Sequence, residues 1–295
     1  MSERILGVIG GSGLYDLPGI REVQPVRLST PFGEPSDELM RGRLGDVQVV
    51  FLPRHGKGHR LLPSEIPFRA NVFAMKTLGV EWLLSIGTVG SLREQLVPGH
   101  VVVPDQFIDR THQRPLSFFG DGVVAHVGIA DPYCSVLSRL LAEAGESLMP
   151  AGRELHRGGT YLCMEGPQFS TQAESYLYRA WGMDVIGMTN LQEAKLAREA
   201  EMCYATLALV TDYDCWHPEH DHVRIEDVLA VMHQNSDHAQ RALAAAVAAP
   251  PPAGCACQRA LENAVMTRRD AWPEAAYHKL RPLLQRLVEP KEEMA

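Results

Sequence analysis

The feature that most constrains this chain is an uninterrupted apolar run, Cys203 to Val210, followed directly by Thr211-Asp212-Tyr213-Asp214-Cys215-Trp216. Such a run predicts a strand that is covered on both faces, as in a parallel sheet flanked by helices. Open α/β sheets bind ligands beyond the carboxyl ends of these strands. Because alternate strand residues share a face, Asp212 and Asp214 are candidates to contact one ligand. The spacing alone equally allows two solvated loop acids.

Composition restricts the class of protein. The chain has 295 residues, of which 45% are hydrophobic and 22% charged, as in an ordinary globular protein. Its formal net charge of −8 argues against nonspecific binding to nucleic acid. No apolar stretch reaches the roughly 18 residues of a membrane-spanning helix, and the first residues do not resemble a signal peptide. We therefore expect a cytoplasmic protein with no nucleic-acid or membrane partner.

The first predicted strand, Ile5 to Ile9, leads into Gly10-Gly11-Ser12-Gly13. Glycines let backbone N–H groups approach an anion closely, and the Ser12 hydroxyl adds another donor, so this turn is a candidate phosphate loop. A dinucleotide-binding fingerprint fails because Asp16 stands where the last glycine belongs. A plain tight turn is the alternative that stays open.

A second predicted strand, residues 47–52, ends in the basic segment that contains Arg54 and His55. Arg54 is able to hold an oxyanion through two parallel N–H bonds, and His55 is able to add another donor. A solvated basic loop explains the same residues equally well.

Two more strand ends carry small residues or hydroxyl groups. The predicted strand over residues 82–86 opens into Gly87 and Thr88. Thr189 directly precedes Asn190, which has the sequence pattern of a helix N-cap. Helix N-termini favour anions, so Thr189 is a further candidate ligand for phosphate.

Histidines and cysteines raise the question of a metal. His217, His220 and His222 are close in sequence, but a proline interrupts them and no glutamate-containing helical zinc motif is present. Cys255-Ala256-Cys257 is a weak signal for a metal or for oxidation. The other cysteines are scattered, which indicates reduced thiols rather than a disulfide framework. We therefore expect no metal.

The chain also shows a boundary near its end. A long predicted helix stops at Pro250-Pro251-Pro252, and proline both ends helices and marks linkers. This pattern predicts one unit over residues 1–249, followed by a proline-rich linker and a C-terminal arm of two helices over residues 250–295.

Taken together, the motifs resemble the trimeric purine nucleoside phosphorylase family and, within it, the 5'-methylthioadenosine phosphorylases. The likeness runs over residues 5 to 247 and is carried by Gly10–Leu14, Pro53–Gly56, Gly90–Glu94, Phe107–Thr111, Glu165–Phe169, Met188-Thr189 and Thr211–Trp216. It implies an α/β fold, a single domain whose twisted mixed central β-sheet is flanked by helices. It further implies a homotrimer with shared active sites.

The same resemblance implies a pentosyltransferase of purine and methionine salvage. The reaction would be phosphorolysis of S-methyl-5'-thioadenosine to adenine and 5-methylthioribose 1-phosphate. Inorganic phosphate would be the co-substrate, with no cofactor. A phosphorylase of methylthioinosine or of purine nucleosides in general is the alternative. The carboxylate pair favours a 6-aminopurine, because a 6-oxopurine calls for an amide or another neutral donor.

Residue by residue, the resemblance assigns phosphate binding to Ser12, Arg54, His55, Gly87, Thr88 and Thr189. It assigns contact with the nucleoside to Phe169, Met188, Asp212, Tyr213, Asp214 and, from a neighbouring subunit, His126. Specificity is assigned to Ser170, Ile225, Val228 and Leu229. Asp212 and Asp214 would be the catalytic pair, with Asp212 donating to purine N7. That donation requires a protonated carboxyl group, and therefore a pKa raised above its ordinary value of about 4.

Overall fold

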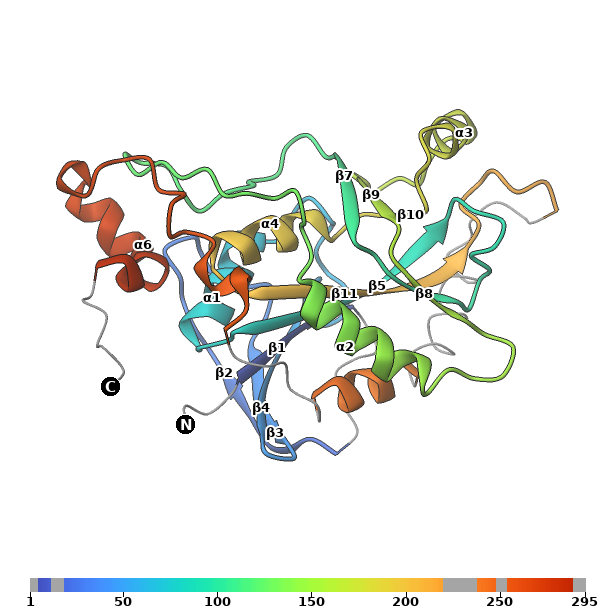
Figure 1. Ribbon diagram of the computed structural model, residues 1–295, viewed down its shortest axis with the longest axis horizontal. Helices are drawn as coiled ribbons and strands as arrows, with labels where there is room; N and C mark the ends of the chain where they lie inside the picture. Colours follow the sequence, from blue (N-terminus) through green and yellow to red (C-terminus); the bar gives the residue numbers. More distant parts are fainter. Residues whose placement is uncertain (1–4, 12–18, 220–237, 248–253, 289–295) are drawn as a thin grey trace.

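A computed structural model describes residues 5–11, 19–219, 238–247 and 254–288 (Figure 1). Its centre is an 11-stranded sheet with the order β2-β3-β4-β1-β5-β10-β9-β7. Off this path, β11 pairs with β5, β6 pairs with β11, and β8 pairs with β6. The strands are β1 Ile5–Gly10, β2 Arg21–Val26, β3 Leu39–Leu44, β4 Val47–Pro53, β5 Trp82–Ser91, β6 Val101–Val103, β7 Gln106–Arg110, β8 Leu155–Arg157, β9 Thr160–Met164, β10 Val185–Gly187 and β11 Cys203–Asp212.

The four central strands run in one direction. β1 pairs in parallel with β4 and with β5, and β5 pairs in parallel with β11. Around this centre, β3, β6 and β10 pair antiparallel with β4, β11 and β5, so the sheet is mixed, as predicted. Parallel neighbours bring the carboxyl ends of β1, β4, β5 and β11 to the same edge of the sheet.

The long apolar strand β11 is buried along its whole length up to Thr211 and becomes half-buried at Asp212. Its register with β5 shifts between Val210 and Asp212, where a bulge interrupts the ladder. Bulges redirect the side chains that follow them. The prediction of a strand covered on both faces is confirmed, and its irregular end is where the two aspartates stand.

Helices cover both faces of the sheet (Figure 1). On one face, α1 (Phe68–Thr77), α4 (Leu191–Glu199) and α6 (Glu274–Val288) enclose an apolar core with β1 and β4. On the other, α2 (Ser135–Glu146) and the helical residues 238–247 enclose a second core with β1, β5 and β11. Within the described residues, no helix is long and apolar enough to cross a membrane.

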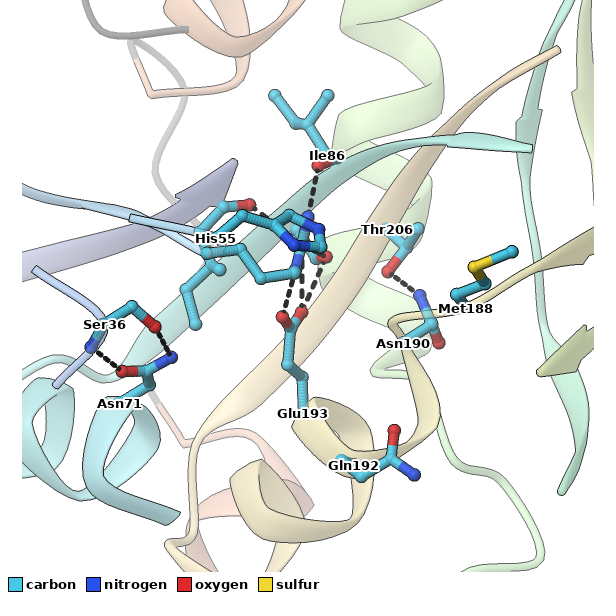
Figure 2. Close-up of polar contacts among 12 residues, drawn as sticks. Ser36, His55, Asn71, Ile86, Met188, Asn190, Gln192, Glu193 and Thr206 are labelled. Atoms are coloured by element: carbon cyan, nitrogen blue, oxygen red, sulfur yellow. Dashed lines mark hydrogen bonds and ion pairs between the residues drawn. The ribbon is translucent and has the colours of Figure 1, made fainter. Parts of the chain in front are cut away.

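The starts of two helices differ in their caps. The helix α3 (Gln172–Ala180) begins with a capping box, in which the Thr171 hydroxyl accepts from the Glu174 backbone and the Glu174 carboxylate accepts from the Thr171 backbone. Asn190 does precede α4, but its side chain makes no capping bond. The amide instead donates to the Thr206 hydroxyl at 2.6 Å (Figure 2), which ties the start of α4 to β11.

The segment between β6 and His126 contains the edge strand β7, which the sequence pattern did not predict. Its side chains alternate between exposed and half-buried, and it pairs with β9 alone among the described strands, so it lacks the apolar run that marks an interior strand. β5 also continues beyond its expected end at Ile86 to Ser91, because residues 87–90 stay paired with β11.

The C-terminal segment differs from the expected arm of two helices. Its described residues contain two short 3-10 turns, Ala256–Arg259 and Arg269–Ala271, and the single helix α6. Leu261, Leu280, Leu283 and Leu284 are buried in the same apolar core as α1 and α4. The segment is therefore part of the main hydrophobic core.

Candidate active site

A cavity of about 590 Å³ opens at the edge where the central parallel strands end. Gly11 follows β1, Arg54 and His55 follow β4, and residues 87–90 belong to β5, so three strand ends contribute to one wall. The lining residues that the sequence predicted are Arg54, His55, Gly87, Thr88, Phe169, Met188, Thr189, Asp212 and Asp214. The cationic and acidic strand ends, which the sequence could not connect, share one cleft.

Other predicted residues are not brought into the cavity. Tyr213 is not among the lining residues; its hydroxyl donates to the Glu94 carbonyl at 3.1 Å and its ring packs against Trp216. Ser170 lies outside the lining as well, with its hydroxyl 3.8 Å from the Met164 sulfur. Both were expected near the nucleoside.

His126 is exposed, and its loop is held by a hydrogen bond from its backbone N–H to the Ala264 carbonyl at 2.8 Å. The predicted residues Ser12, Ile225, Val228 and Leu229 lie outside the described residues. So do His220 and His222 of the histidine cluster.

Arg54 is the central charge of the cleft, and its side chain is only 2% exposed. The Nε–H and an Nη2–H group donate to the two carboxylate oxygens of Glu193 (Figure 2). Further bonds run from Nη1 to the Ile86 carbonyl at 3.0 Å and from Nη2 to the Ser85 hydroxyl at 2.7 Å. A buried guanidinium needs such compensation, because an unpaired charge in the protein interior is costly.

This arrangement changes the expected role of Arg54. Its bidentate edge faces Glu193, so two parallel N–H bonds to phosphate are not available from that edge. Nη1 donates to one carbonyl and lies beside Gly87, where a Cβ atom would be 3.7 Å from it. The guanidinium thus presents a single N–H group of Nη1 toward the cleft.

His55 is half-buried, and its imidazole is not readily protonated. Its Nδ1 lies 2.9 Å from the Leu61 carbonyl oxygen, which can only accept, so the ring hydrogen sits on Nδ1. Burial lowers the pKa of His55 to about 4, and the neighbouring Arg54 acts in the same direction. At neutral pH the imidazole is therefore neutral, with the lone pair on Nε2.

Asp212 stands at the end of β11 with both oxygens engaged. The Thr211 hydroxyl donates to Oδ2 at 2.7 Å, and the Asp214 backbone N–H donates to Oδ1 at 2.8 Å. Burial raises the pKa of Asp212 to about 6, against the effect of these two bonds. This is the direction that a carboxyl proton donor requires.

Asp214 is buried and has a left-handed backbone, with φ of 52°. A non-glycine residue rarely adopts this conformation, and such strain is concentrated at functional sites. Burial raises the pKa of Asp214 as well. Two neighbouring carboxyl groups therefore both favour the neutral form more than a solvated aspartate does.

Apolar residues form another wall of the cleft. Phe169 lines it and is 47% exposed, so its ring is open to a ligand rather than packed in the core. Met188 lies against Gly166, where a Cβ atom would be 2.5 Å from the Met188 sulfur. The methionine therefore fills space that a side chain at position 166 would occupy.

Sequence reasoning missed the residues that hold these groups in place. Glu193 lies in the first turn of α4, and nothing local distinguishes it from an exposed capping acid. Arg114 is buried; it donates to the Glu165 carboxylate at 2.9 Å, to the Gln192 side chain at 3.2 Å and to the Met188 carbonyl. The one available signal was Arg54 itself, since a buried arginine needs a buried acid.

Comparison with known proteins identifies the class to which this fold and cleft belong. Residues 5–248 match the family model described as the phosphorylase superfamily. The chain belongs to this superfamily.

Within it, the chain is similar to proteins named S-methyl-5'-thioadenosine phosphorylase. The one from Gloeobacter violaceus is 56% identical over 284 residues, which cover 95% of this chain and 94% of the relative. The one from Thermosynechococcus vestitus is 57% identical over 286 residues, which cover 96% and 99%.

Solved structures give the same result. A methylthioadenosine phosphorylase from an Antarctic soil metagenomic library has a TM-score of 0.90 and 47% identity, and the match covers 96% of this chain and 100% of the other. Methylthioadenosine phosphorylase from Schistosoma mansoni, in complex with adenine, has a TM-score of 0.79 and 39% identity, with 84% and 91% covered. A match that covers 96% of this chain extends beyond the sheet into the C-terminal segment.

Proposed function

We propose that this chain is a pentosyltransferase that cleaves S-methyl-5'-thioadenosine with inorganic phosphate, giving adenine and 5-methylthioribose 1-phosphate. The observation that carries the proposal is one cleft with an arginine and a helix N-terminus at one end and two acids of raised pKa at the other. The relatives described above, at 56% and 57% identity, bear the name of this activity.

The reaction exchanges one bond for another. A phosphate oxygen bonds to C1' of the ribose as the bond from C1' to purine N9 breaks, and the departing base takes a proton at N7. Positive charge develops on the sugar and negative charge on the base. The site must therefore hold an anion beside the sugar and donate a proton to the base.

At the phosphate end, we assign binding of the anion to Arg54 Nη1, the backbone at Gly87 and Thr88, and Thr189 at the start of α4. The Ser12 hydroxyl belongs to the same proposed set. His55, neutral with its lone pair on Nε2, is suited to accept a hydrogen bond from a protonated phosphate oxygen. Because Glu193 already compensates the charge of Arg54, the anion is held mainly by directed hydrogen bonds.

At the base end, we assign the proton donor to Asp212 and the support of N7 and the 6-amino group to Asp214. A carboxyl group with its pKa raised to about 6 retains a proton more readily near neutral pH than a solvated aspartate does. Phe169 packs on the purine and Met188 lies beneath the ribose in this proposal, both from positions that line the cleft.

Four further assignments belong to the proposal. Ile225, Val228 and Leu229 would enclose the methylthio group, which an apolar wall accommodates without unpaired polar groups. Ser170 would influence specificity through its neighbours. His126 would reach the active site of a neighbouring copy in a homotrimer, with its exposed loop as the bridging element. Phosphate is the co-substrate, and no metal or organic cofactor takes part.

A single assay tests the activity. The protein is incubated with methylthioadenosine, methylthioinosine or adenosine, each with and without phosphate, and the released base and sugar are identified by chromatography. The proposal expects adenine and a sugar phosphate from methylthioadenosine, only when phosphate is present. Release of base without phosphate would indicate hydrolysis, and a preference for methylthioinosine would favour the 6-oxopurine alternative.

A further inference from the structure

Four cysteines that are far apart in the sequence meet at a place outside the cleft. The sulfur atoms of Cys134, Cys203, Cys255 and Cys257 all lie within 4.8 Å of one another. The Cys134 and Cys255 sulfurs are 3.5 Å apart. Three of these side chains are buried and Cys255 is half-buried. The distribution that appears scattered in the sequence is thus a compact group in the fold.

Three separate elements present these thiols. Cys134 is the residue before α2, Cys203 is the first residue of β11, and the other pair flanks the start of the 3-10 turn at Ala256. Backbone hydrogen bonds fix the first two: the Cys134 N–H donates to the Tyr204 carbonyl at 2.8 Å, and the Cys203 N–H donates to the Glu81 carbonyl at 2.9 Å. Main-chain hydrogen bonds therefore fix the positions of Cys134 and Cys203.

We propose that these four thiolates form a tetrahedral site for a soft divalent metal ion, with zinc as the metal that the donor set favours. Sulfur ligands at about 2.3 Å from zinc lie roughly 3.8 Å from one another in a tetrahedron. The separation of 3.5 Å between the Cys134 and Cys255 sulfurs is close to that spacing. It is far longer than a disulfide bond of about 2.05 Å. Four thiolates select zinc over hard cations such as magnesium.

Local electrostatics support anionic sulfur at this place. The Leu137 N–H donates to the Cys134 sulfur at 3.5 Å, at the positive end of α2. A divalent ion would take the place of the thiol protons, because metal binding to thiols releases them.

The position of the site gives it a structural role. Cys203 opens β11, and Asp212 closes the same strand, so the site lies at the opposite end from the cleft. A metal there fastens the C-terminal segment, through Cys255 and Cys257, to the sheet. Binding energy that depends on the folded geometry adds to the stability of the fold. This inference is independent of the proposed phosphorolysis.

The first test measures metal in the intact protein. The chain is purified under reducing conditions without a chelator and without a metal-affinity column. Its zinc content is then measured by elemental mass spectrometry. We expect about one zinc per chain, released when a mercurial reagent blocks the thiols. Cobalt added to protein that was reduced and stripped of metal should give the thiolate charge-transfer and visible bands of a tetrahedral cobalt site.

Variants locate the site. Replacing the pair from the 3-10 turn, Cys255→Ser with Cys257→Ser, should abolish zinc and cobalt binding, and Cys203→Ser should do the same. Two controls should keep the metal: Cys163→Ser, a buried cysteine outside the group, and His156→Ala, which removes the cluster of His100, Glu154 and His156. Loss of metal in His156→Ala alone would assign it to that cluster instead.

Two results would overturn the proposal. One is a reduced protein that binds neither zinc nor cobalt and in which all six cysteines react independently with a thiol reagent. The other is a protein isolated with disulfides between these cysteines that, after reduction, still binds no metal. Both measurements read the metal and the thiols directly and do not depend on enzyme activity.

Discussion

Glu193 binds the guanidinium of Arg54 with both of its carboxylate oxygens, and the two side chains are 1% and 2% exposed. The Ser85 and Tyr204 hydroxyls also donate to Glu193, at 2.8 and 2.9 Å. The acid comes from α4 and the arginine from the end of β4, so the pair joins the helix layer to the sheet directly beneath the cleft. In the proposed function, this pair positions the Arg54 N–H group that is assigned to phosphate.

Replacing Glu193 by glutamine should be strongly destabilising. The amide keeps the shape but leaves a buried guanidinium charge uncompensated, which typically costs about 3–5 kcal/mol. Urea unfolding should show this loss, and the KM for phosphate should rise because Nη1 is no longer held in place. The matched control is Glu146→Gln, which opens the exposed ion pair with Arg157 and should leave both quantities nearly unchanged. An unaltered unfolding midpoint in Glu193→Gln would contradict the buried-pair account.

Asp212→Asn should lower kcat by about 100-fold or more, because the amide cannot donate a proton as an acid does. The shape fits, since an amide oxygen can accept from the Asp214 N–H and the amide nitrogen can donate to the Thr211 hydroxyl. With the pKa of Asp212 raised to about 6, kcat/KM of the wild type should fall as the pH rises through 6. That descending limb should be absent in the variant. Phosphate titrates identically in both proteins and so cancels in the comparison.

The same substitution should change stability in a defined direction. A carboxyl group whose pKa rises from 3.8 unfolded to about 6 folded binds more protons in the folded state across that window. Its contribution to stability is present below pH 3.8 and is lost as the pH rises through 6, by up to about 3 kcal/mol. Asp212→Asn should therefore be more stable than the wild type at pH 7, by chemical unfolding, while its activity is lower. A variant that is less stable at pH 7 would show that the charge is well accommodated.

His55→Gln tests a pKa shift of the opposite sign over an overlapping range of pH. The pKa of His55 falls from 6.5 unfolded to about 4 folded, so the unfolded chain binds more protons between these values. The wild type should lose stability as the pH falls from 6.5 to 4, by up to about 3 kcal/mol from this residue. The glutamine variant should lose less over that range in parallel urea titrations. If the two proteins respond alike, the imidazole is not held neutral by its surroundings.

Gly90 should tolerate no side chain. A Cβ atom there would lie 2.9 Å from Asp212 Oδ1 and 3.1 Å from Ile186 Cγ2. Gly90→Ala should therefore displace the Asp212 carboxyl group and reduce kcat sharply. Gly87→Ala on the same strand is the control for stability, because its Cβ atom would meet only Arg54 Nη1 at 3.7 Å, an ordinary contact. Equal unfolding midpoints and kcat for Gly90→Ala and the wild type would show that β5 can move to make room.

The sequence predicted those parts of the fold that local pattern determines. The buried run of β11 and the polar strand ends both depend on residues that are near one another in the chain. The strand β7 was missed because its residues alternate between exposed and half-buried and its partner β9 lies far along the chain. Tyr213 was placed in the site by the family resemblance, but its hydroxyl donates to the Glu94 carbonyl and it does not line the cavity.

The site was predictable up to the point where long-range pairing begins. Arg54 and Asp212 were candidates because each follows a predicted strand, where open α/β sheets bind ligands, although solvated loops explained them equally well. Glu193 was not, since 139 residues separate it from Arg54 and a glutamate in the first turn of a helix has an ordinary local explanation. The cysteine group has the same origin: 121 residues separate Cys134 from Cys255. Only the fold brings such partners together.

The burial of Leu280, Leu283 and Leu284 in the core shared with α1 and α4 has a consequence for synthesis of the protein. The ribosome makes α1 and α4 before it makes these leucines of α6. Until the leucines emerge, the apolar faces of α1 and α4 lack their cover, and nascent chains with such faces exposed are prone to aggregate. This core can therefore be completed only after α6 has been synthesised.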